Sequence, residues 1–348
     1  MRFDTDYIEG CHPAILQRLT ETNYCKQQGY GLDEYCASAR ERIQKACHAP
    51  NSDVHFVTGG TQANVTVISH ALRPYQGVLC AVTGHINGHE TGATEARGHK
   101  VLPLPEKDAK ITADQVDAYL CHYRSMEHPE HEVEPKMVYL SQPTEQGTLY
   151  SLAELEAFRS VCDRYGLYLF IDGARLGYAL ATPSNDVTLT DLARLTDVFY
   201  IGGTKVGAMF GEAIVIQNEE IKPQFRYSIK QNEGMLAKGR YLGLQFDTLF
   251  TDDLYTTIAA NAITLADFLR DSLQEMGISF FSSSPTNQIF PIFTRSQVEA
   301  LEQLHVFERW SELPDGRIAI RFCTSWATEK ADLDQLLADI QQIVETVQ

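Results

Sequence analysis

Short apolar runs alternate with segments of helical spacing through much of the chain. The apolar runs cover residues 55–57, 77–81, 101–104, 137–140, 167–171, 197–201 and 213–216. Apolar residues recur every three or four positions, as in helices, over residues 33–46, 63–72, 112–123, 152–165 and 190–195. This alternation predicts an α/β fold in which helices cover both faces of a mostly parallel sheet. The last run follows its predecessor after only a glycine-containing turn, which predicts an antiparallel pair there.

The pattern changes after residue 249. A long helical pattern over residues 254–276 is followed by two short apolar runs, at 289–293 and 317–322, and a closing helical pattern at 330–347. At 348 residues the chain is long for one hydrophobic core and comfortable for two. We therefore expect three parts: an N-terminal segment at residues 1–30, a large domain at 31–249 and a small α+β C-terminal domain at 250–348.

Composition excludes several classes of protein. The net charge is −17, and no run of lysine and arginine offers the basic face that a nucleic-acid binder needs. No apolar stretch approaches the roughly 20 residues of a membrane span. The eight cysteines are scattered without a Cys-x-x-Cys pair, and the first residues lack a basic and an apolar region typical of a signal peptide. Free thiols in the cytoplasm are expected.

Three polar clusters follow predicted strands: residues 59–61 (Gly-Gly-Thr), 172–175 (Asp-Gly-Ala-Arg) and 202–205 (Gly-Gly-Thr-Lys). Ligands of open α/β sheets bind beyond the carboxyl ends of the strands, so the three clusters are expected to share one site. Gly59, Gly60 and Thr61 precede a predicted helix, whose N-terminus suits a phosphate. The alternative is a plain strand–helix turn. Because a G-x-G-x-x-G pattern and the lysine of a P-loop are both missing, a nucleotide-dependent oxidoreductase is disfavoured.

Lys205 and Asp172 carry the chemistry of the other two clusters. An amine held near a sheet among glycines has a depressed pKa and attacks aldehydes, whereas the alternative is a surface lysine in a loop. A carboxylate that ends a fully apolar strand needs a partner, and a protonated pyridine nitrogen is one. The alternative pairs Asp172 with Arg175 or makes it a helix cap. The two residues lie 205 − 172 = 33 positions apart, which fits one strand–helix–strand step.

Several motifs resemble one family, the threonine aldolases within the aromatic-amino-acid β-eliminating lyase group. They are residues 56–64 (FVTGGTQAN), residues 169–176 (LFIDGARL), Thr204-Lys205, His85 with Glu90, Tyr30-Gly31, Thr5-Asp6 and residues 321–324 (RFCT). The similarity extends from Thr5 to Thr324 and implies a fold-type-I enzyme dependent on pyridoxal 5'-phosphate. The reaction that it implies is cleavage of the Cα–Cβ bond of L-threonine or L-allo-threonine to glycine and acetaldehyde.

The resemblance also implies roles for individual residues. Lys205 is expected to hold the cofactor as a Schiff base, with His85 stacked on the pyridine ring. The full set expected to bind the cofactor is Gly59, Gly60, Thr61, His85, Asp172, Arg175, Thr204 and Lys205. Substrate is expected to contact Thr5, Tyr30, Arg175 and Arg321, because guanidinium groups bind a carboxylate in a fork. Tyr30 resembles a tyrosine that reaches the active site of a neighbouring subunit, which implies a homodimer or homotetramer.

Two positions depart from the family pattern. Where the family has Glu-Asn-Thr-His, residues 142–145 read Gln-Pro-Thr-Glu, so Glu145 stands in place of a histidine and becomes a candidate base beside His85. A family arginine is also missing where Leu236 follows Gly234-Met235, and Lys230, Lys238 or Arg240 are candidates to replace it. The open alternatives are a β-eliminating lyase, an amino-acid racemase and a non-catalytic protein that binds pyridoxal phosphate.

Three other features are not assigned to the site. The segment 127–132 (Glu-His-Pro-Glu-His-Glu) fits no standard zinc spacing and is expected to be a solvated loop, so no metal is predicted. His89 has no motif support and is interpreted as a bystander. Trp310 is expected in the core or at an interface rather than in a ligand site.

Overall fold

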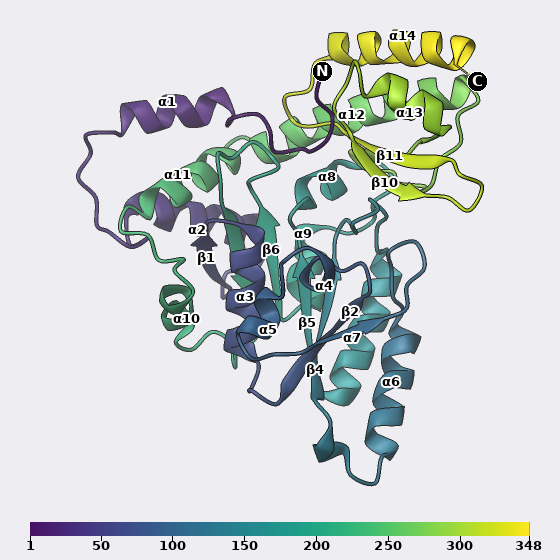
Figure 1. Cartoon of the computed structure of the whole chain (residues 1–348). Helices are drawn as coiled ribbons and strands as arrows, with labels where there is room; N and C mark the ends of the chain where they lie inside the picture. The colour runs from purple at the N-terminus through teal and green to yellow at the C-terminus, as the bar shows by residue number, and fades with distance from the viewer. Residues whose placement is uncertain (348) are drawn as a thin grey trace.

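The computed structural model describes residues 1–347, with a seven-stranded sheet at the centre. The strand order is β1-β7-β6-β5-β4-β2-β3 (Figure 1). The strands are β1 (Asp53–Val57), β2 (Gln76–Ala81), β3 (Val101–Leu104), β4 (Glu134–Ser141), β5 (Tyr168–Asp172), β6 (Val198–Gly202) and β7 (Glu212–Ile216). Strands β2 to β6 pair in parallel, and β7 runs antiparallel to both β6 and β1. The predicted α/β sheet and its antiparallel pair are confirmed.

Successive residues of the central strands supply two separate cores. In β5, Leu169 and Ile171 face one apolar cluster, and Phe170 between them faces another. This follows from the two-residue period of a strand, and because both faces are covered, every position can be apolar. Helix α7 (Leu152–Tyr165) contributes to the first cluster and α3 (Gly60–Ala71) to the second, so the two helices lie on opposite faces of the sheet.

The other helices of this part surround the sheet. They are α1 (Pro13–Glu21), α2 (Glu34–Ala46), α4 (His85–Gly88), α5 (Ala93–Ala96), α6 (Ala113–Ser125), α8 (Leu176–Ala181), α9 (Leu189–Leu195), α10 (Phe225–Gln231) and α11 (Arg240–Leu249), with a 3₁₀ turn at Pro129–His131. Local chemistry sets several of their starts. The Asp33 side chain accepts the Cys36 N–H at the start of α2, and Ser151 forms a capping box with Glu154 at the start of α7.

The C-terminal part has its own sheet and core. Its elements are α12 (Leu254–Glu275), β8 (Gln288–Ile289), β9 (Ile292–Phe293), α13 (Arg295–Leu301), β10 (Glu308–Glu312), β11 (Ile318–Cys323) and α14 (Lys330–Thr346). Residues 289–293, expected as one strand, are two short strands on either side of Pro291, which has no N–H to donate. Along α12, Ile263 belongs to the core of the large sheet and Leu265 to the core of the small one.

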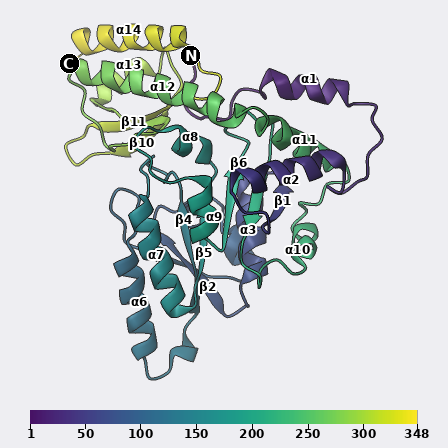
Figure 2. The ribbon, with the colours of Figure 1, turned by 180° about the vertical axis from the view of Figure 1, so that it is seen from behind.

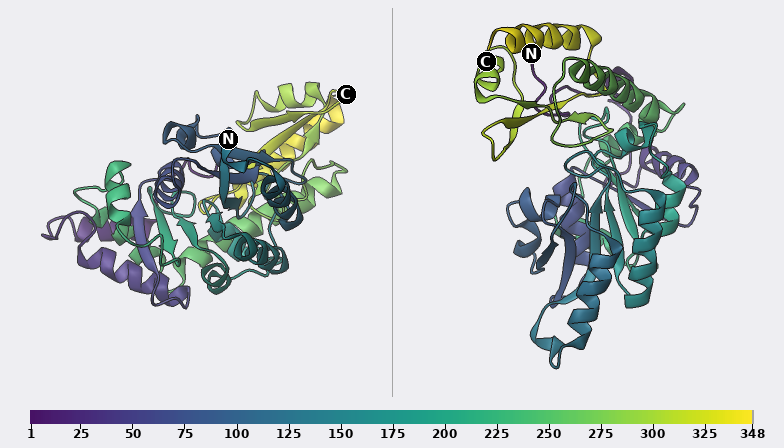
Figure 3. Two further views of the ribbon diagram at one scale, coloured as in Figure 1. Left: turned by 90° about the horizontal axis from the view of Figure 1, so that it is seen from below. Right: turned by 90° about the vertical axis from the view of Figure 1, so that its right-hand side faces the viewer.

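The first residues of the chain lie in the C-terminal part. Phe3 packs in the core of the small sheet, and its carbonyl accepts the Cys323 N–H at 2.8 Å. Figure 2 shows both chain ends beside α14, while α1 lies far to one side. The small part sits over one end of the large sheet (Figure 3). The N-terminal segment therefore runs from one part to the other.

Glycine at position 243 permits close packing of α11 against α2. A Cβ atom built on Gly243 would lie 2.3 Å from Cys36 Sγ and 2.5 Å from Cys36 Cα. We expect Gly243→Ala to lower the free energy of unfolding by about 1–3 kcal/mol, because the two helices must separate. Denaturant unfolding of the cofactor-free chain measures this. A matched control is Gly10→Ala, since no described atom lies within 4 Å of a Cβ there. Equal effects of the two changes would contradict the packing argument.

Candidate active site

The three polar clusters line one cavity of about 310 Å³ at the carboxyl ends of the parallel strands. Its wall is formed by Tyr7, Thr58, Gly59, Gly60, Thr61, His85, Ser141, Pro143, Thr144, Glu145, Asp172, Ala174, Arg175, Tyr200, Thr204, Lys205 and Glu212. The geometry therefore places the expected phosphate, pyridine and aldehyde ligands around a single space.

One end of this cavity is the N-terminus of α3. Gly59 has extended backbone and makes no side-chain cap within the described chain, so the N–H groups of the first turn remain available. The N–H and hydroxyl groups of Thr58 are not available to a ligand, because both donate to Gln62 Oε1, at 2.9 and 2.8 Å. A helix N-terminus with free N–H groups and two small residues fits a phosphate.

Glu212 lies at the same end and was not selected from the sequence. Its carboxyl group accepts the Gly203 N–H at 3.1 Å and the Thr204 hydroxyl at 2.8 Å. Burial raises the pKa of the Glu212 carboxyl to about 8. At neutral pH the group is mostly uncharged, so it does not repel an anion bound at α3. Nothing in the sequence marks this residue, because it simply begins a strand.

Asp172 lies at the middle of the cavity and is 4% exposed. Its carboxylate accepts the Ala174 N–H at 3.0 Å, Asn64 Nδ2 at 3.1 Å and the Tyr139 hydroxyl. Burial alone would raise the pKa of Asp172, but the charge of His85 and these hydrogen bonds outweigh it and lower the pKa. The carboxylate is therefore ionised and fits a protonated pyridine nitrogen.

Arg175 does not pair with Asp172, which removes one alternative drawn from the sequence. Its Nε and Nη2 atoms donate to the two oxygens of Asp6, at 2.7 and 3.1 Å. Asn287 of the small part donates to the same carboxylate at 2.9 Å. The pair thereby joins the loop after β5, the N-terminal segment and the C-terminal part.

Lys205 follows β6 and lines the cavity, so it is not a free surface lysine. Its pKa is lowered, first by burial and then by the charge of Arg175, while Asp6 and Asp172 act in the opposite direction. A larger fraction of neutral amine follows, and the neutral amine is the form that attacks an aldehyde.

A hydrogen-bonded chain connects Asp172 to His85. Asn64 Nδ2 also donates to Glu90 Oε1 at 2.8 Å, and the same oxygen lies 2.8 Å from His85 Nδ1. Burial lowers the pKa of His85, but the bond to Glu90 and the charge of Asp172 outweigh it, so the pKa is raised. The Glu90 side chain is fully buried, which fixes the orientation of the imidazole ring.

Glu145 lies against the backbone of His85. Its Oε1 atom accepts the His85 N–H at 3.0 Å and the Ser141 hydroxyl at 2.8 Å. Burial is the largest influence and raises the pKa of the Glu145 carboxyl. A carboxyl group with a raised pKa is suited to exchange protons near neutral pH.

A second cavity of about 320 Å³ adjoins the first. It is lined by Thr5, Tyr7, His85, His89, Glu145, Arg175, Lys205, Glu308, Trp310 and Arg321. Five of these residues, namely Tyr7, His85, Glu145, Arg175 and Lys205, also line the first cavity. The residues of the phosphate and pyridine ends are not among them. We call the first space the inner cavity and the second the outer cavity.

Arg321 is the fixed cation of the outer cavity. It donates to Gln288 Oε1 at 3.2 Å and to the Asp4 carbonyl at 3.0 Å, and it pairs with Glu308. Its Nε atom is buried and has no hydrogen-bond partner within residues 1–347, and the same holds for Thr5 Oγ1. Donors left over in this way suit a carboxylate ligand.

Trp310 was expected in the core or at an interface, and the structure places it in the wall of the outer cavity. Its ring lies under the Arg321 guanidinium, 5.4 Å from the ring centroid, and forms part of the outer cavity wall. It stands on β10, an edge strand with many charged residues, so the sequence gave no reason to place it in a site.

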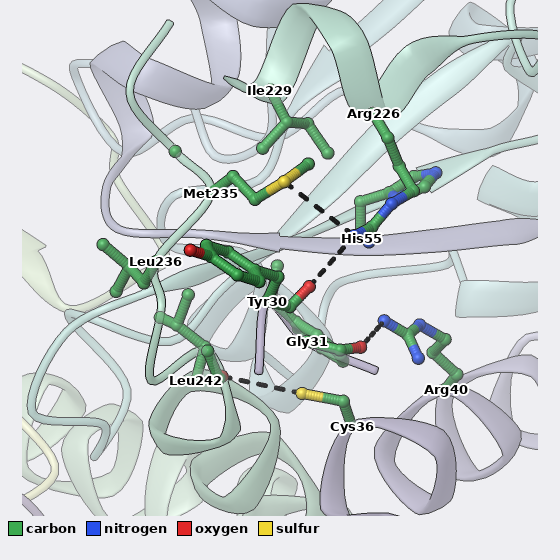
Figure 4. Close-up of a pocket in the computed structure, with 13 residues that line it drawn as sticks. Tyr30, Gly31, Cys36, Arg40, His55, Arg226, Ile229, Met235, Leu236 and Leu242 are labelled. Carbon is green, nitrogen blue, oxygen red and sulfur yellow. Dashed lines mark hydrogen bonds between the residues drawn. The ribbon is translucent and has the colours of Figure 1, made fainter. Parts of the chain in front are cut away.

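Tyr30 lies outside both cavities of its own chain. Figure 4 shows it in a separate small pocket, with its carbonyl bonded to Arg226 at 3.1 Å. Tyr30 is 48% exposed, and its ring faces Lys230, whose Nζ atom is 5.6 Å from the ring centroid. Arg240 is buried and donates to backbone carbonyls of the segment 22–25, so it is not free to replace the missing family arginine.

The remaining candidates line neither cavity. His128 pairs with Glu130 at 3.2 Å on an exposed loop. Among residues 1–347 no three His, Cys, Asp or Glu side chains form a group that could hold a metal ion. Over the same residues no helix is both long and apolar enough to span a membrane. The eight cysteines are free.

The chain matches a known protein family over most of its length. The profile of the beta-eliminating lyase family matches residues 3–308. The chain belongs to the beta-eliminating lyase family. The residues of both cavities, apart from Trp310 and Arg321, lie within the matched range.

Individual relatives agree with this assignment. The structure of the threonine aldolase of Leishmania major has a TM-score of 0.95 and 43% identity, and the match covers 99% of each chain. A low specificity L-threonine aldolase of a Pseudomonas species is 29% identical over 350 residues, 99% of this chain and 98% of that protein. The histidinol-phosphate aminotransferase of Clostridium acetobutylicum shares the fold, with a TM-score of 0.75, 13% identity and complete (100%) coverage of both chains.

The Glu90 carboxylate gives a prediction for the pH dependence of this family member. Because Glu90 raises the pKa of His85, we expect Glu90→Gln to lower that pKa. A histidine that acts as the base must be neutral. With His85 in that role, the acid limb of the activity profile moves to lower pH, and the maximal rate falls about tenfold because a weaker base remains.

The measurement is the pH profile of turnover, with the His85 imidazole followed by NMR in the cofactor-free chain. Glu95→Gln is a matched control, since Glu95 is an exposed carboxylate five residues away. An acid limb that stays in place in the Glu90 variant would contradict the role given to this carboxylate.

Proposed function

We propose that this lyase-family chain is an aldolase that uses pyridoxal 5'-phosphate to cleave the Cα–Cβ bond of L-threonine or L-allo-threonine. The products are glycine and acetaldehyde. The observation that carries the proposal is one cavity that holds a helix N-terminus, an ionised Asp172 and the amine of Lys205. The aldolases of Leishmania major and Pseudomonas support the choice of substrate.

The inner cavity would hold the cofactor. The N–H groups at Gly60 and Thr61, with Thr204 nearby, would bind its phosphate, Asp172 its pyridine nitrogen and Lys205 its aldehyde carbon. Once bound, the cofactor supplies an electron sink that accepts the electron pair of a bond broken at Cα. His85 would lie against the ring, held there by Glu90.

The outer cavity would hold the amino acid. Arg321 and Thr5 offer unpartnered donors to the substrate carboxylate, and Arg175 adds positive charge while its own geometry is held by Asp6. Fixing the carboxylate would decide which bond at Cα is aligned for cleavage. His85 or Glu145, through a water where needed, would remove the proton of the β-hydroxyl group.

Elimination or racemisation is a second candidate reaction, because of the family to which the chain belongs. If the Cα–H bond is the one aligned, the same residues would support β-elimination or racemisation. The family profile is named for elimination, whereas the aldolases resemble this chain over nearly its whole length. The aldolase is therefore the first proposal.

The active site would lie between subunits of a homodimer or homotetramer in the cytoplasm. Large apolar side chains are exposed near the cavity mouth and along the N-terminal segment, namely Tyr7, Ile8, Leu16, Tyr24, Tyr30, Leu32 and Met209. Large exposed apolar side chains are typical of a subunit interface. Tyr30 and Lys230, which lie together outside the chain's own cavities, would then serve the neighbouring site.

The amine of Lys205 provides the first test. We expect Lys205→Ala to abolish release of acetaldehyde from threonine, because no other amine lines the inner cavity among residues 1–347. The wild-type chain should absorb near about 420 nm with cofactor, and borohydride should fix that cofactor on the peptide with Lys205.

Lys330→Ala is the control, because Lys330 is an exposed residue at the start of α14. Full activity of the Lys205 variant would overturn the proposal. A wild-type chain that binds cofactor yet releases no aldehyde would instead favour elimination or racemisation.

A subunit-mixing experiment tests the shared site. Lys205→Ala and Tyr30→Ala should each be inactive alone, because each lacks one required group in every site. In mixed dimers one site regains both groups, so about a quarter of wild-type activity should return.

The control mixes Lys205→Ala with the Lys205→Ala/Tyr30→Ala double variant, which leaves no complete site. Hybrid dimers that form but stay inactive would place Tyr30 outside the neighbouring site.

A further inference from the structure

His89 is the residue of the outer cavity whose role the proposed function does not use. It caps the C-terminal end of α4, one turn after His85, and the two ring centroids are 5.6 Å apart. It lines the outer cavity together with Trp310 and Arg321 but does not line the inner one. Its ring makes no hydrogen bond to any described residue, and it is exposed to the cavity.

The other two candidate bases, His85 and Glu145, line the inner cavity as well as the outer one. His85 Nδ1 is bonded to the buried Glu90. Glu145 accepts two hydrogen bonds at one oxygen, and burial raises its pKa, so it keeps its proton to a higher pH. His89 is the imidazole with both ring nitrogens free, and it stands on the substrate side.

The surroundings of His89 keep it neutral. Its pKa is lowered, first by partial burial and then by the charges of His85 and Arg321, against which Glu308 acts. These are the charged groups that face it from α4 and from the small part. A neutral imidazole accepts a proton, whereas a charged one cannot.

We propose that His89, in place of His85 or Glu145, is the catalytic residue that binds the β-hydroxyl group of the substrate and accepts its proton during aldol cleavage. The inference rests on the proposed function. The O–H bond breaks and its proton passes to a ring nitrogen of His89. The O–H electron pair becomes the second bond of the aldehyde carbonyl. The pair of the Cα–Cβ bond stays with Cα, and a proton returned to Cα completes glycine.

Arrangement of the outer cavity supports this assignment. Arg321, with its unpartnered Nε, is the carboxylate anchor, and Lys205 marks where Cα must lie. The residues that line the outer cavity and not the inner one are Thr5, His89, Glu308, Trp310 and Arg321. Among these five, His89 carries the imidazole, a group that accepts a proton when it is neutral.

The test is His89→Asn, which keeps a polar side chain but removes the base. We expect kcat for threonine to fall about 100-fold. Exchange of the α-proton of glycine in D2O should change less than about twofold, because glycine has no β-hydroxyl group. The dissociation constant of pyridoxal phosphate should also stay constant, since His89 does not line the inner cavity.

A binding measurement separates hydroxyl recognition from catalysis. Serine and alanine differ by the β-hydroxyl group, so the ratio of their dissociation constants, followed by cofactor absorbance, reports its recognition. We expect the wild-type preference for serine to disappear in His89→Asn and to persist in Glu145→Gln. His122→Asn, an exposed histidine on α6, should leave all values unchanged.

Two outcomes would overturn the inference. Unchanged threonine turnover in His89→Asn would remove His89 from the reaction. An equal loss of threonine turnover and glycine exchange would mean that His89 acts on the geometry of the whole site instead. Failure of the proposed function is distinguishable, because the wild-type chain itself would then release no aldehyde.

Discussion

An ionised carboxylate buried at the end of a central strand is the constraint on which this site depends. Asp172 has almost no contact with water, and such a charge is costly unless donors surround it. The Ala174 N–H, Asn64 and Tyr139 supply these donors. Because Asn64 donates to Glu90 as well, the same requirement fixes His85. Asp172 and the His85 imidazole are thus held by one network.

A second buried charge, on Asp6, joins the two parts of the chain beside the outer cavity. Asp6 is fully buried, and its pKa is lowered because the charges of Arg175 and Lys205 outweigh the effect of burial. Loss of one partner of a buried ion pair strongly destabilises a fold. The N-terminal segment therefore cannot leave without removing the partner of Arg175. Asn287 binds the same carboxylate from the small part. The outer cavity therefore assembles only when three distant segments meet.

The sequence predicted the parts of this molecule that follow simple periodicity. Strand β5 and helix α7 were recognisable because an apolar run and a 3.6-residue pattern leave little choice. Helix α11 was missed, since it is buried on all sides and carries polar residues such as Gln245 and Asp247 in buried positions. Strand β10 was missed for the opposite reason, because its exposed edge is rich in charge.

The site shows the same division. Lys205 and Asp172 follow strands and could be selected with a chemical reason. Glu212 and Trp310 could not, because their importance arises only when a neighbouring strand or the small part brings them to the cavity. Arg175 was selected but its partner was uncertain, and only the tertiary fold decides between Asp6 and Asp172.

Net charge says little about what such a site binds. The chain carries −17, yet the inner cavity fits a phosphate and the outer one a carboxylate. Burial raises the pKa of the Glu145 carboxyl, and it raises the pKa of Glu212 to about 8, so Glu212 adds little negative charge at neutral pH. Arg321 and the N-terminus of α3 supply positive charge to the outer and inner cavities. Anions are therefore accommodated because acidic side chains are buried, and not because lysine and arginine are in excess.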